Sequence, residues 1–177
     1  MLHVSDHWWA VNSHSYEKSA RENMRKILAL CMTLIIGLAC VGLAVADEAS
    51  DTKALVEKGV AMAKEKGMDA TLKAIGDPKG PFVVGDLYLF AGPLDKVTAS
   101  AHPFAADKLV GKDLTNLKDS KGNQFFIKFK EIAEKPGSGW VEYWWPKPGA
   151  TDPSLKKTFI MRVPGQNAYI AAGYYPK

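Results

Sequence analysis

The sequence predicts an α+β domain that begins with helices and continues as an antiparallel sheet interrupted by one helix. Three observations lead to this fold class. Apolar residues recur at three- and four-residue spacing between positions 52 and 75, and the spacing changes to alternation from Phe82 onwards. Turn signals rich in Gly and Pro separate the later segments. Helical patterns followed by alternating segments are typical of one α+β domain.

Two helices are predicted at the start of this domain. The first begins near Thr52, is capped by Ser50 or Asp51, and ends at Gly67. The second covers residues 69–75 and stops at the Gly-Asp-Pro sequence that follows it. These helices therefore precede the sheet in the chain.

The remaining elements are five strands and one helix. Strands are predicted over residues 82–90, 97–101, 140–145, 156–163 and 168–175, and an amphipathic helix over residues 123–135. The first two strands are expected to form a hairpin, which ends at His102 because the residue before a proline favours an extended backbone. Alternation places Tyr88 and Phe90 on one face of the first strand.

Residues 24–46 have the layout of a secretory signal peptide. Two basic residues precede an uncharged apolar run over residues 27–45, and small residues lead up to Ala46. We expect cleavage after Ala46, which would leave residues 47–177 as one periplasmic or secreted domain. The alternative is a retained membrane anchor formed by residues 27–45, because the run is close to the length of a membrane span.

The residues around this leader add two expectations. Residues 1–23 lie ahead of the complete export signal that starts at Met24, so we expect them to be a disordered upstream extension from a mis-assigned start codon. Cys31 and Cys40 would be removed with the leader. The exported domain would then contain no disulfide and no thiol nucleophile.

Composition excludes several classes of function. The chain has 23 Lys and Arg against 19 Asp and Glu, and these charges are interspersed rather than blocked. Nucleic-acid binding therefore has no electrostatic footprint here. No nucleophile–base pair, metal-ligand set or phosphate-binding loop is visible in the sequence. We therefore expect a protein that is not an enzyme and that has neither a cofactor nor a metal site.

Several short segments, in the order in which they occur, resemble the single Cache domain family of type 2. They are GDLYLF at 85–90, AHP at 101–103, LVGKDL at 109–114, Asp119 with Gly122, GWVEY at 139–143 with Trp145 and Pro148, the lysine pair at 156–157, and AGYY at 172–175. The resemblance covers about residues 51–176. It implies a PAS-like fold with a long N-terminal helix and a curved antiparallel sheet.

The resemblance also implies a function. Members of this family are extracytoplasmic sensor modules of bacterial chemoreceptors and sensor kinases, and they bind small organic acids, amino acids or related metabolites. The sequence departs from the receptor pattern because it reaches Lys177 without a signalling segment. We therefore expect a sensor domain without its own output module, which passes its signal to a membrane-bound signalling or transport partner.

Seven residues are candidate ligand contacts. They are Tyr88, Phe90, His102, Tyr143, Trp145, Lys156 and Lys157. The aromatic side chains could form the apolar walls of a pocket, and an inward lysine would supply a cation for a ligand carboxylate. By analogy with the family, the strand-end position of His102 could contact the ligand.

Each candidate also has a plainer interpretation. The face that carries Tyr88 could simply pack against the helix over 123–135, His102 could make a structural hydrogen bond, and both lysines could be solvated. The alternative function is a protein-interaction module that has lost its pocket and that docks onto a partner or forms a homodimer through its N-terminal helix. The aromatic strand over 140–145 is a second candidate dimer contact, because Trp and Tyr are favoured at interfaces.

Overall fold

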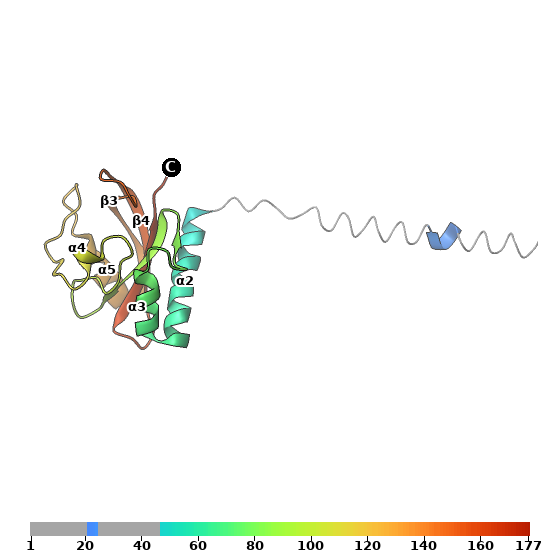
Figure 1. The fold of residues 1–177 in the computed structure, drawn as a ribbon, viewed down its shortest axis with the longest axis horizontal. Helices are drawn as coiled ribbons and strands as arrows, with labels where there is room; N and C mark the ends of the chain where they lie inside the picture. Colours follow the sequence, from blue (N-terminus) through green and yellow to red (C-terminus); the bar gives the residue numbers. More distant parts are fainter. Residues whose placement is uncertain (1–20, 25–46) are drawn as a thin grey trace, which may run out of the picture. The chain divides into compact units, whose positions relative to one another are not determined.

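The computed structural model describes residues 21–24 and 47–177 (Figure 1). The described residues fall into two units, residues 21–24 and residues 47–177. In the first unit, the described residues 21–24 are helical. The predicted upstream extension and signal peptide otherwise lie outside the described residues and stay predictions. In the described ranges, no helix is both long enough and apolar enough to cross a membrane.

The second unit begins with the two predicted helices. Helix α2 spans Glu48–Lys66 and helix α3 spans Met68–Gly76. The predicted cap of α2 was wrong: Asp47 is the N-cap, and its side chain accepts a hydrogen bond from the Ala49 amide. The acidic residues Glu48 and Asp51 then lie in the first turn, where their negative charges interact favourably with the positive end of the helix dipole.

An antiparallel sheet follows, as predicted. Its strands within residues 47–177 are β1 (Val83–Val84), β2 (Leu87–Pro93), β3 (Ser138–Pro146), β4 (Pro153–Arg162) and β5 (Ala168–Tyr174). Their order in the sheet is β1-β2-β5-β4-β3, so β5, the last strand, lies at the centre and pairs with β2. Helix α5 (Phe125–Glu134) separates β2 from β3 in the sequence, and the short helix α4 (Ala106–Leu109) lies before it.

Two strand predictions were wrong. The segment expected as one strand over 82–90 is divided by a turn at Gly85, where φ is +60°. Residues 97–101 do not return as a strand, and among the described residues they make isolated bridges at Ala99 and Ala101. The physical reason is that β2 pairs along its length with β5, from Tyr88 to Pro93, and the 97–101 segment meets it only at Ala91.

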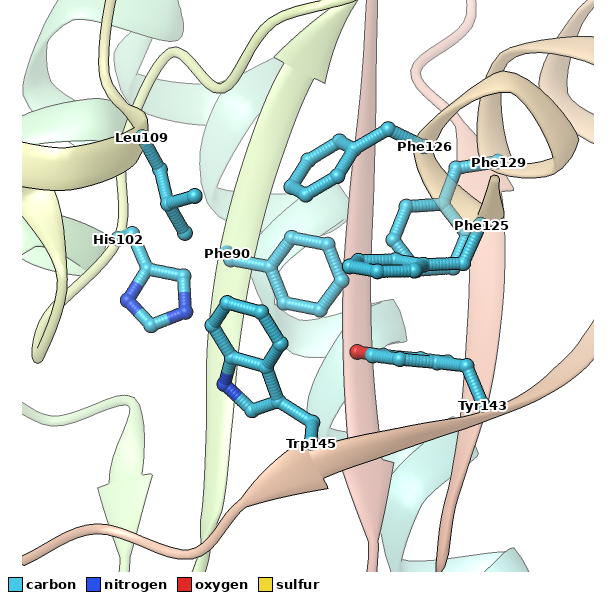
Figure 2. A pocket seen from close by; sticks show the side chains of 8 residues that line it. All are labelled: Phe90, His102, Leu109, Phe125, Phe126, Phe129, Tyr143 and Trp145. Carbon is cyan, nitrogen blue, oxygen red and sulfur yellow. The ribbon is translucent and has the colours of Figure 1, made fainter. Parts of the chain in front are cut away.

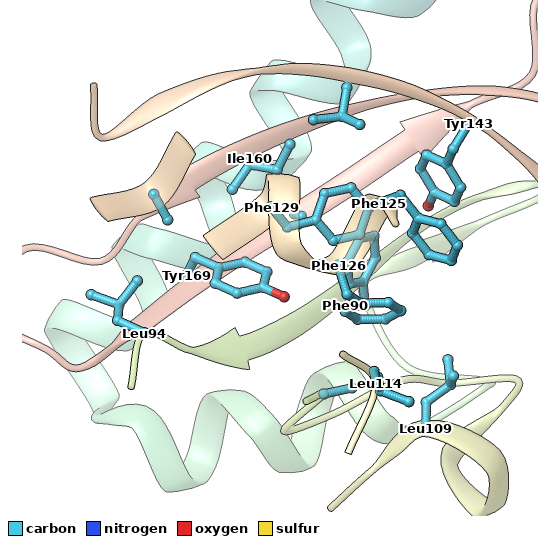
Figure 3. Close-up of a cluster of buried hydrophobic side chains, with 14 of the residues drawn as sticks. Phe90, Leu94, Leu109, Leu114, Phe125, Phe126, Phe129, Tyr143, Ile160 and Tyr169 are labelled. Atoms are coloured by element: carbon cyan, nitrogen blue, oxygen red, sulfur yellow. The ribbon is translucent and has the colours of Figure 1, made fainter. Parts of the chain in front are cut away.

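The sheet separates two apolar layers. Helices α2 and α3 cover one face, and α4, α5 and the intervening loops cover the other (Figure 1). The helix-side core comprises Leu55, Val56, Val60, Ala63, Ile75, Phe82, Leu89, Ala91, Ala101, Phe159, Val163, Ala168, Ile170 and Ala172. The aromatic core on the other face includes Tyr88 and Val141. It also includes Phe90, Phe125, Phe126, Phe129, Tyr143, Ile160 and Tyr169, which are labelled in Figure 3.

Helix α2 lies very close to the sheet. A Cβ atom at Gly59 would stand 2.6 Å from Cδ1 of Leu89 and 3.2 Å from Cγ2 of Ile170, so a larger residue at this crossing would require the Leu89 side chain to shift. The helix-side core is therefore tightly packed against the back of the strands that carry the candidate site.

Candidate functional site

A small cavity lies within the aromatic core (Figure 2). Its walls are Phe90, His102, Leu109, Phe125, Phe126, Phe129, Tyr143 and Trp145. It measures about 190 Å³ when the space on its open side is included, and its enclosed part has room for about one water molecule. Typical ligand pockets hold roughly 300–1,000 Å³, so this cavity is small.

The cavity wall is built from five parts of the fold, and the loop before α4 and α4 itself supply His102 and Leu109. Strand β2 supplies Phe90, strand β3 supplies Tyr143 and Trp145, and the start of α5 supplies three phenylalanines (Figure 2). The rings of Phe125 and Tyr143 stack with centroids 4.3 Å apart, which ties the helix to β3. The resulting environment is apolar and aromatic, as the alternation of these strands predicted.

Lys156 lies beside this cavity and is fully buried, with 0% of its surface exposed. Its Nζ atom lies 3.8 Å from the ring centroid of Tyr88, 5.3 Å from that of Tyr175 and 5.8 Å from that of Phe90. Among the described residues, Nζ has no hydrogen-bond partner. Because Phe90 also lines the cavity, the amine and the cavity share a wall.

A glycine on the neighbouring strand leaves room for the Lys156 side chain in this position. A Cβ atom at Gly173 would stand 2.7 Å from Cε of Lys156 and would also clash with the Thr158 hydroxyl. The lysine stem therefore crosses β5 where that strand has no side chain, and the amine reaches Tyr88 on β2 beyond it. Any larger residue at this position would displace the amine.

Burial lowers the pKa of the Lys156 amine well below its usual value, and the Asp86 carboxylate opposes this only in part. Asp86 itself pairs with Lys147 at 3.3 Å near the surface. An aromatic ring beneath an ammonium contributes about 0.5–2 kcal/mol, whereas removing the ion from water costs several kcal/mol. Desolvation therefore dominates at Lys156, and the surrounding side chains do not compensate for the cost of burying its charged form.

His102 is held as a neutral imidazole. Its Nδ1 atom accepts hydrogen bonds from the amides of Phe104 and Ala105, at 3.2 and 3.1 Å. The ring proton therefore resides on Nε2, and the second ring nitrogen lies on the side of Phe90 and Trp145 in Figure 2. Burial, with a smaller effect of the nearby Lys156 charge, lowers the pKa of His102 to about 3.

Tyrosine and tryptophan groups complete the surroundings of the amine. Burial raises the pKa of Tyr88 to about 12, although hydrogen bonding with Tyr175 and Trp145 lowers it. The Tyr175 hydroxyl donates to the carbonyl oxygen of Pro146 at 2.7 Å, and burial raises its pKa as well. These phenols stay neutral near pH 7 and supply no negative charge to Lys156.

A loop carboxylate holds strand β3 beside the cavity. One Asp119 oxygen accepts from the amides of Lys121 and Asn123, and the other accepts from the Asn123 side chain and the Trp144 amide. Burial would raise the pKa of Asp119, but these hydrogen bonds outweigh it and lower the pKa to about 2. The loop is thereby fastened next to Trp145, whose ring lines the cavity.

The structure brings six of the seven predicted site residues together. Tyr88, Phe90, His102, Tyr143, Trp145 and Lys156 lie on the aromatic face of the sheet. Lys157 lies on the opposite face, partly exposed, and pairs with Glu142 at 2.8 Å. In the part of the chain that the structure describes, no group of three or more His, Cys, Asp or Glu side chains is placed to hold a metal ion.

Sequence reasoning missed other parts of the site. The phenylalanines of α5 line the cavity and Tyr175 lies beside the Lys156 amine, and neither is among the seven predicted site residues. Alternation from Gly173 could have placed Tyr175 on the same face of the chain. The contact between Gly173 and Lys156 depends on the pairing of β4 with β5, which no local signal reveals.

Comparison with known proteins gives a consistent result. A family model described as a Cache domain matches residues 50–177. The methyl-accepting chemotaxis protein McpP of Pseudomonas putida is 35% identical over 74 residues, which are 42% of this chain and 13% of that protein. The match thus spans only a small part of this curated relative.

Three solved structures have a similar fold. A periplasmic sensor domain of a chemotaxis protein has a TM-score of 0.59 and 25% identity, with coverage of 77% of this chain and 100% of that one. A Cache chemosensory domain described for carboxylic acid recognition has a TM-score of 0.55 and 24% identity, with coverage of 88% and 98%. A methyl-accepting chemotaxis protein from Vibrio parahaemolyticus has a TM-score of 0.60 and 21% identity, with coverage of 71% and 86%.

Proposed function

Because the chain belongs to the Cache domain family, of the type 2 single Cache kind, we propose that it is a periplasmic sensor domain for a small carboxylate or amino-acid-like metabolite. Cache domains serve as extracytoplasmic sensor domains of chemoreceptors, and a protein of this kind binds ligands rather than catalysing a reaction. The observation that carries the ligand class is Lys156, a buried amine without a partner among the described residues.

A carboxylate is the group that this amine lacks. Buried charges in proteins are normally paired, and a hydrogen bond between an ammonium and a carboxylate is about twice as strong as one between neutral groups. Asp86 already pairs with Lys147, and the surrounding phenols and imidazole are neutral. A ligand carboxylate would therefore supply the missing negative charge.

The neighbouring side chains suit the rest of a small ligand. Phe90, Tyr143 and Trp145 would contact its apolar part, and the Nε2–H group of His102 would donate to a second polar atom. Since the enclosed space holds about one water molecule, we infer that the ligand has few heavy atoms and that rings such as Tyr88 shift to connect the cavity with Lys156. One structural neighbour recognises carboxylic acids, but the likeness to it concerns the fold.

The biological setting is inferred from the family. We propose that the domain reports ligand occupancy to a membrane-bound signalling or transport partner, as expected of a module related to chemoreceptors. The expectations that it carries no output module of its own, that it forms a homodimer through the N-terminal helix, and that its leader is cleaved after Ala46 stay predictions.

A thermal-shift screen of short carboxylic acids, amino acids and amines tests the proposed function. A carboxylate present at a hundredfold excess over its dissociation constant should stabilise the protein by about 2.7 kcal/mol. The variant Lys156→Met should lose this response, whereas Lys157→Met, one residue away on the other face, should keep it. The absence of any shift at millimolar carboxylate would contradict the proposal.

The small cavity gives one observation in favour of the alternative function, a protein-interaction module without a ligand. Bulky rings already occupy most of the space where a metabolite would lie. If that module is correct, no small molecule will shift the melting temperature, and sedimentation at micromolar concentration will show a ligand-independent dimer. A ligand-dependent shift that Lys156→Met abolishes would exclude it.

A further inference from the structure

Among the described residues, no anion makes a hydrogen bond with the Lys156 amine. Strand β2 presents Tyr88 to the amine, the segment after β5 presents Tyr175, and the loop before α4 presents His102; Tyr143 is paired with Lys156 across β3 and β4. Helix α5 contributes phenylalanine rings to this core. The Asp86 carboxylate acts on Lys156 from the turn between β1 and β2, and it is paired with Lys147.

We propose that this site takes up one proton with each carboxylate that it binds, so that the domain senses the undissociated acid rather than the anion alone. The inference rests on the proposed function and adds that ligand binding at the same site is regulated by pH. Its physical basis is geometric: a fully buried amine has three aromatic rings around it and, among the described residues, no carboxylate within hydrogen-bond distance.

The empty site and the carboxylate-bound site differ in whether they favour the protonated form of the Lys156 amine. In the empty site, burial disfavours the ammonium, as the lowered pKa of Lys156 indicates. When a carboxylate arrives, the ammonium gains an adjacent opposite charge and a hydrogen bond, so its pKa rises. The balanced step is amine plus proton plus carboxylate giving an ammonium–carboxylate pair, and no covalent bond is made or broken.

Other groups are poorly placed to take this proton. The Nδ1 atom of His102 already accepts two backbone amides, so protonating it would break both hydrogen bonds. The phenols of Tyr88, Tyr143 and Tyr175 are already protonated at neutral pH, because burial raises their pKa values. The ammonium of Lys156 is therefore the site of proton uptake.

Calorimetric titration of the full chain with acetate and with propionate tests this inference. The titrations are run at pH 7.5 in phosphate and in Tris, whose ionisation enthalpies differ, so that the difference in heat counts the protons exchanged. We expect uptake of up to one proton per bound acid and a dissociation constant that rises with pH, by at most tenfold for each pH unit. A short carboxylic acid is itself fully ionised in this range and contributes no such slope.

The outcomes separate the two proposals. Binding without proton uptake, and with a flat pH dependence, would overturn the coupling and leave the proposed carboxylate site standing. No binding of either acid would contradict the carboxylate site itself, and the coupling would fall with it. Lys156→Met should lose both binding and uptake, and Lys157→Met should retain both; uptake of a proton by the Lys156→Met variant would assign the proton to another group and overturn the inference.

Discussion

Both faces of the sheet bury an apolar core, but the polar residues buried with each core differ in how their hydrogen bonds are satisfied. On the helix side, the buried polar residues Thr52 and Thr71 each donate to a backbone carbonyl four residues earlier, so they are satisfied within their own helices. On the aromatic side, His102 and Lys156 are buried in a layer of rings, and the amine has no partner among the described residues. The helix-side core thus specifies and stabilises the fold, and the aromatic core retains an amine without a hydrogen-bond partner among the described residues, which is the group that the proposed ligand would pair with.

Shortening one large side chain on each face gives the largest expected effect. Phe129→Ala on the aromatic side should lower the free energy of unfolding by about 3–5 kcal/mol, and Ile170→Ala on the helix side by about 2–5 kcal/mol, because both residues are fully buried. Urea denaturation measures both values. Only Phe129→Ala enlarges the cavity, so only this variant should bind longer carboxylates than the wild type does. Equal changes in ligand range for both variants would contradict the division of roles between the faces.

Acid should weaken the aromatic side through His102. Its pKa is about 3 in the folded protein and about 6.5 when unfolded, so the unfolded chain binds the extra proton as the pH falls between these values. The wild type should therefore lose stability from about pH 6.5 downwards, by on the order of 4 kcal/mol at pH 3. His102→Asn keeps an acceptor for the Phe104 and Ala105 amides without titrating. Urea denaturation at pH 7, 5 and 4 should show the gap between the two proteins; parallel curves would refute the assignment.

Removing the buried amine should strengthen the fold. Lys156→Met keeps a similar length without a polar group, so it should raise the free energy of unfolding by about 1–3 kcal/mol near pH 7. Because the folded pKa of Lys156 lies well below the unfolded value, the unfolded chain binds more protons, and the wild type should gain stability as pH rises toward about 10.5. The advantage of the variant should shrink accordingly. Urea denaturation at pH 7 and 9.5 measures the change, and a destabilised variant would show that the amine has a partner that stabilises it.

Local patterns predicted the faces of the site better than its contacts. Alternation placed Tyr88 with Phe90 and Tyr143 with Trp145, and each pair does share the aromatic face. Alternation also requires that Lys156 and the residue after it point to opposite faces, but it cannot decide which one is buried.

Pairing between distant strands decides that choice. Lys156 is opposite Tyr143 on β3, and its stem crosses β5 at Gly173, so the register of β4 with both neighbours sets the amine inside. The expected hairpin failed for the same kind of reason, because β2 pairs with β5, the strand at the far end of the chain. Residue spacing cannot predict the register between distant strands. It does predict the helices and which side chains share one face of a strand.

The smallest expected effect comes from the lysine on the other face, and it sharpens the contrast with its buried neighbour. Lys157 is 35% exposed and its partner Glu142 is 55% exposed, so their ion pair is worth less than about 1 kcal/mol. Lys157→Met should therefore lower the free energy of unfolding by at most a few tenths of a kcal/mol, and 1 M NaCl should abolish the difference by screening the pair. Adjacent lysines would then respond to the same substitution with opposite signs. If Lys157→Met were as stabilising as Lys156→Met, the gain at position 156 would reflect the new apolar side chain rather than the loss of a buried amine.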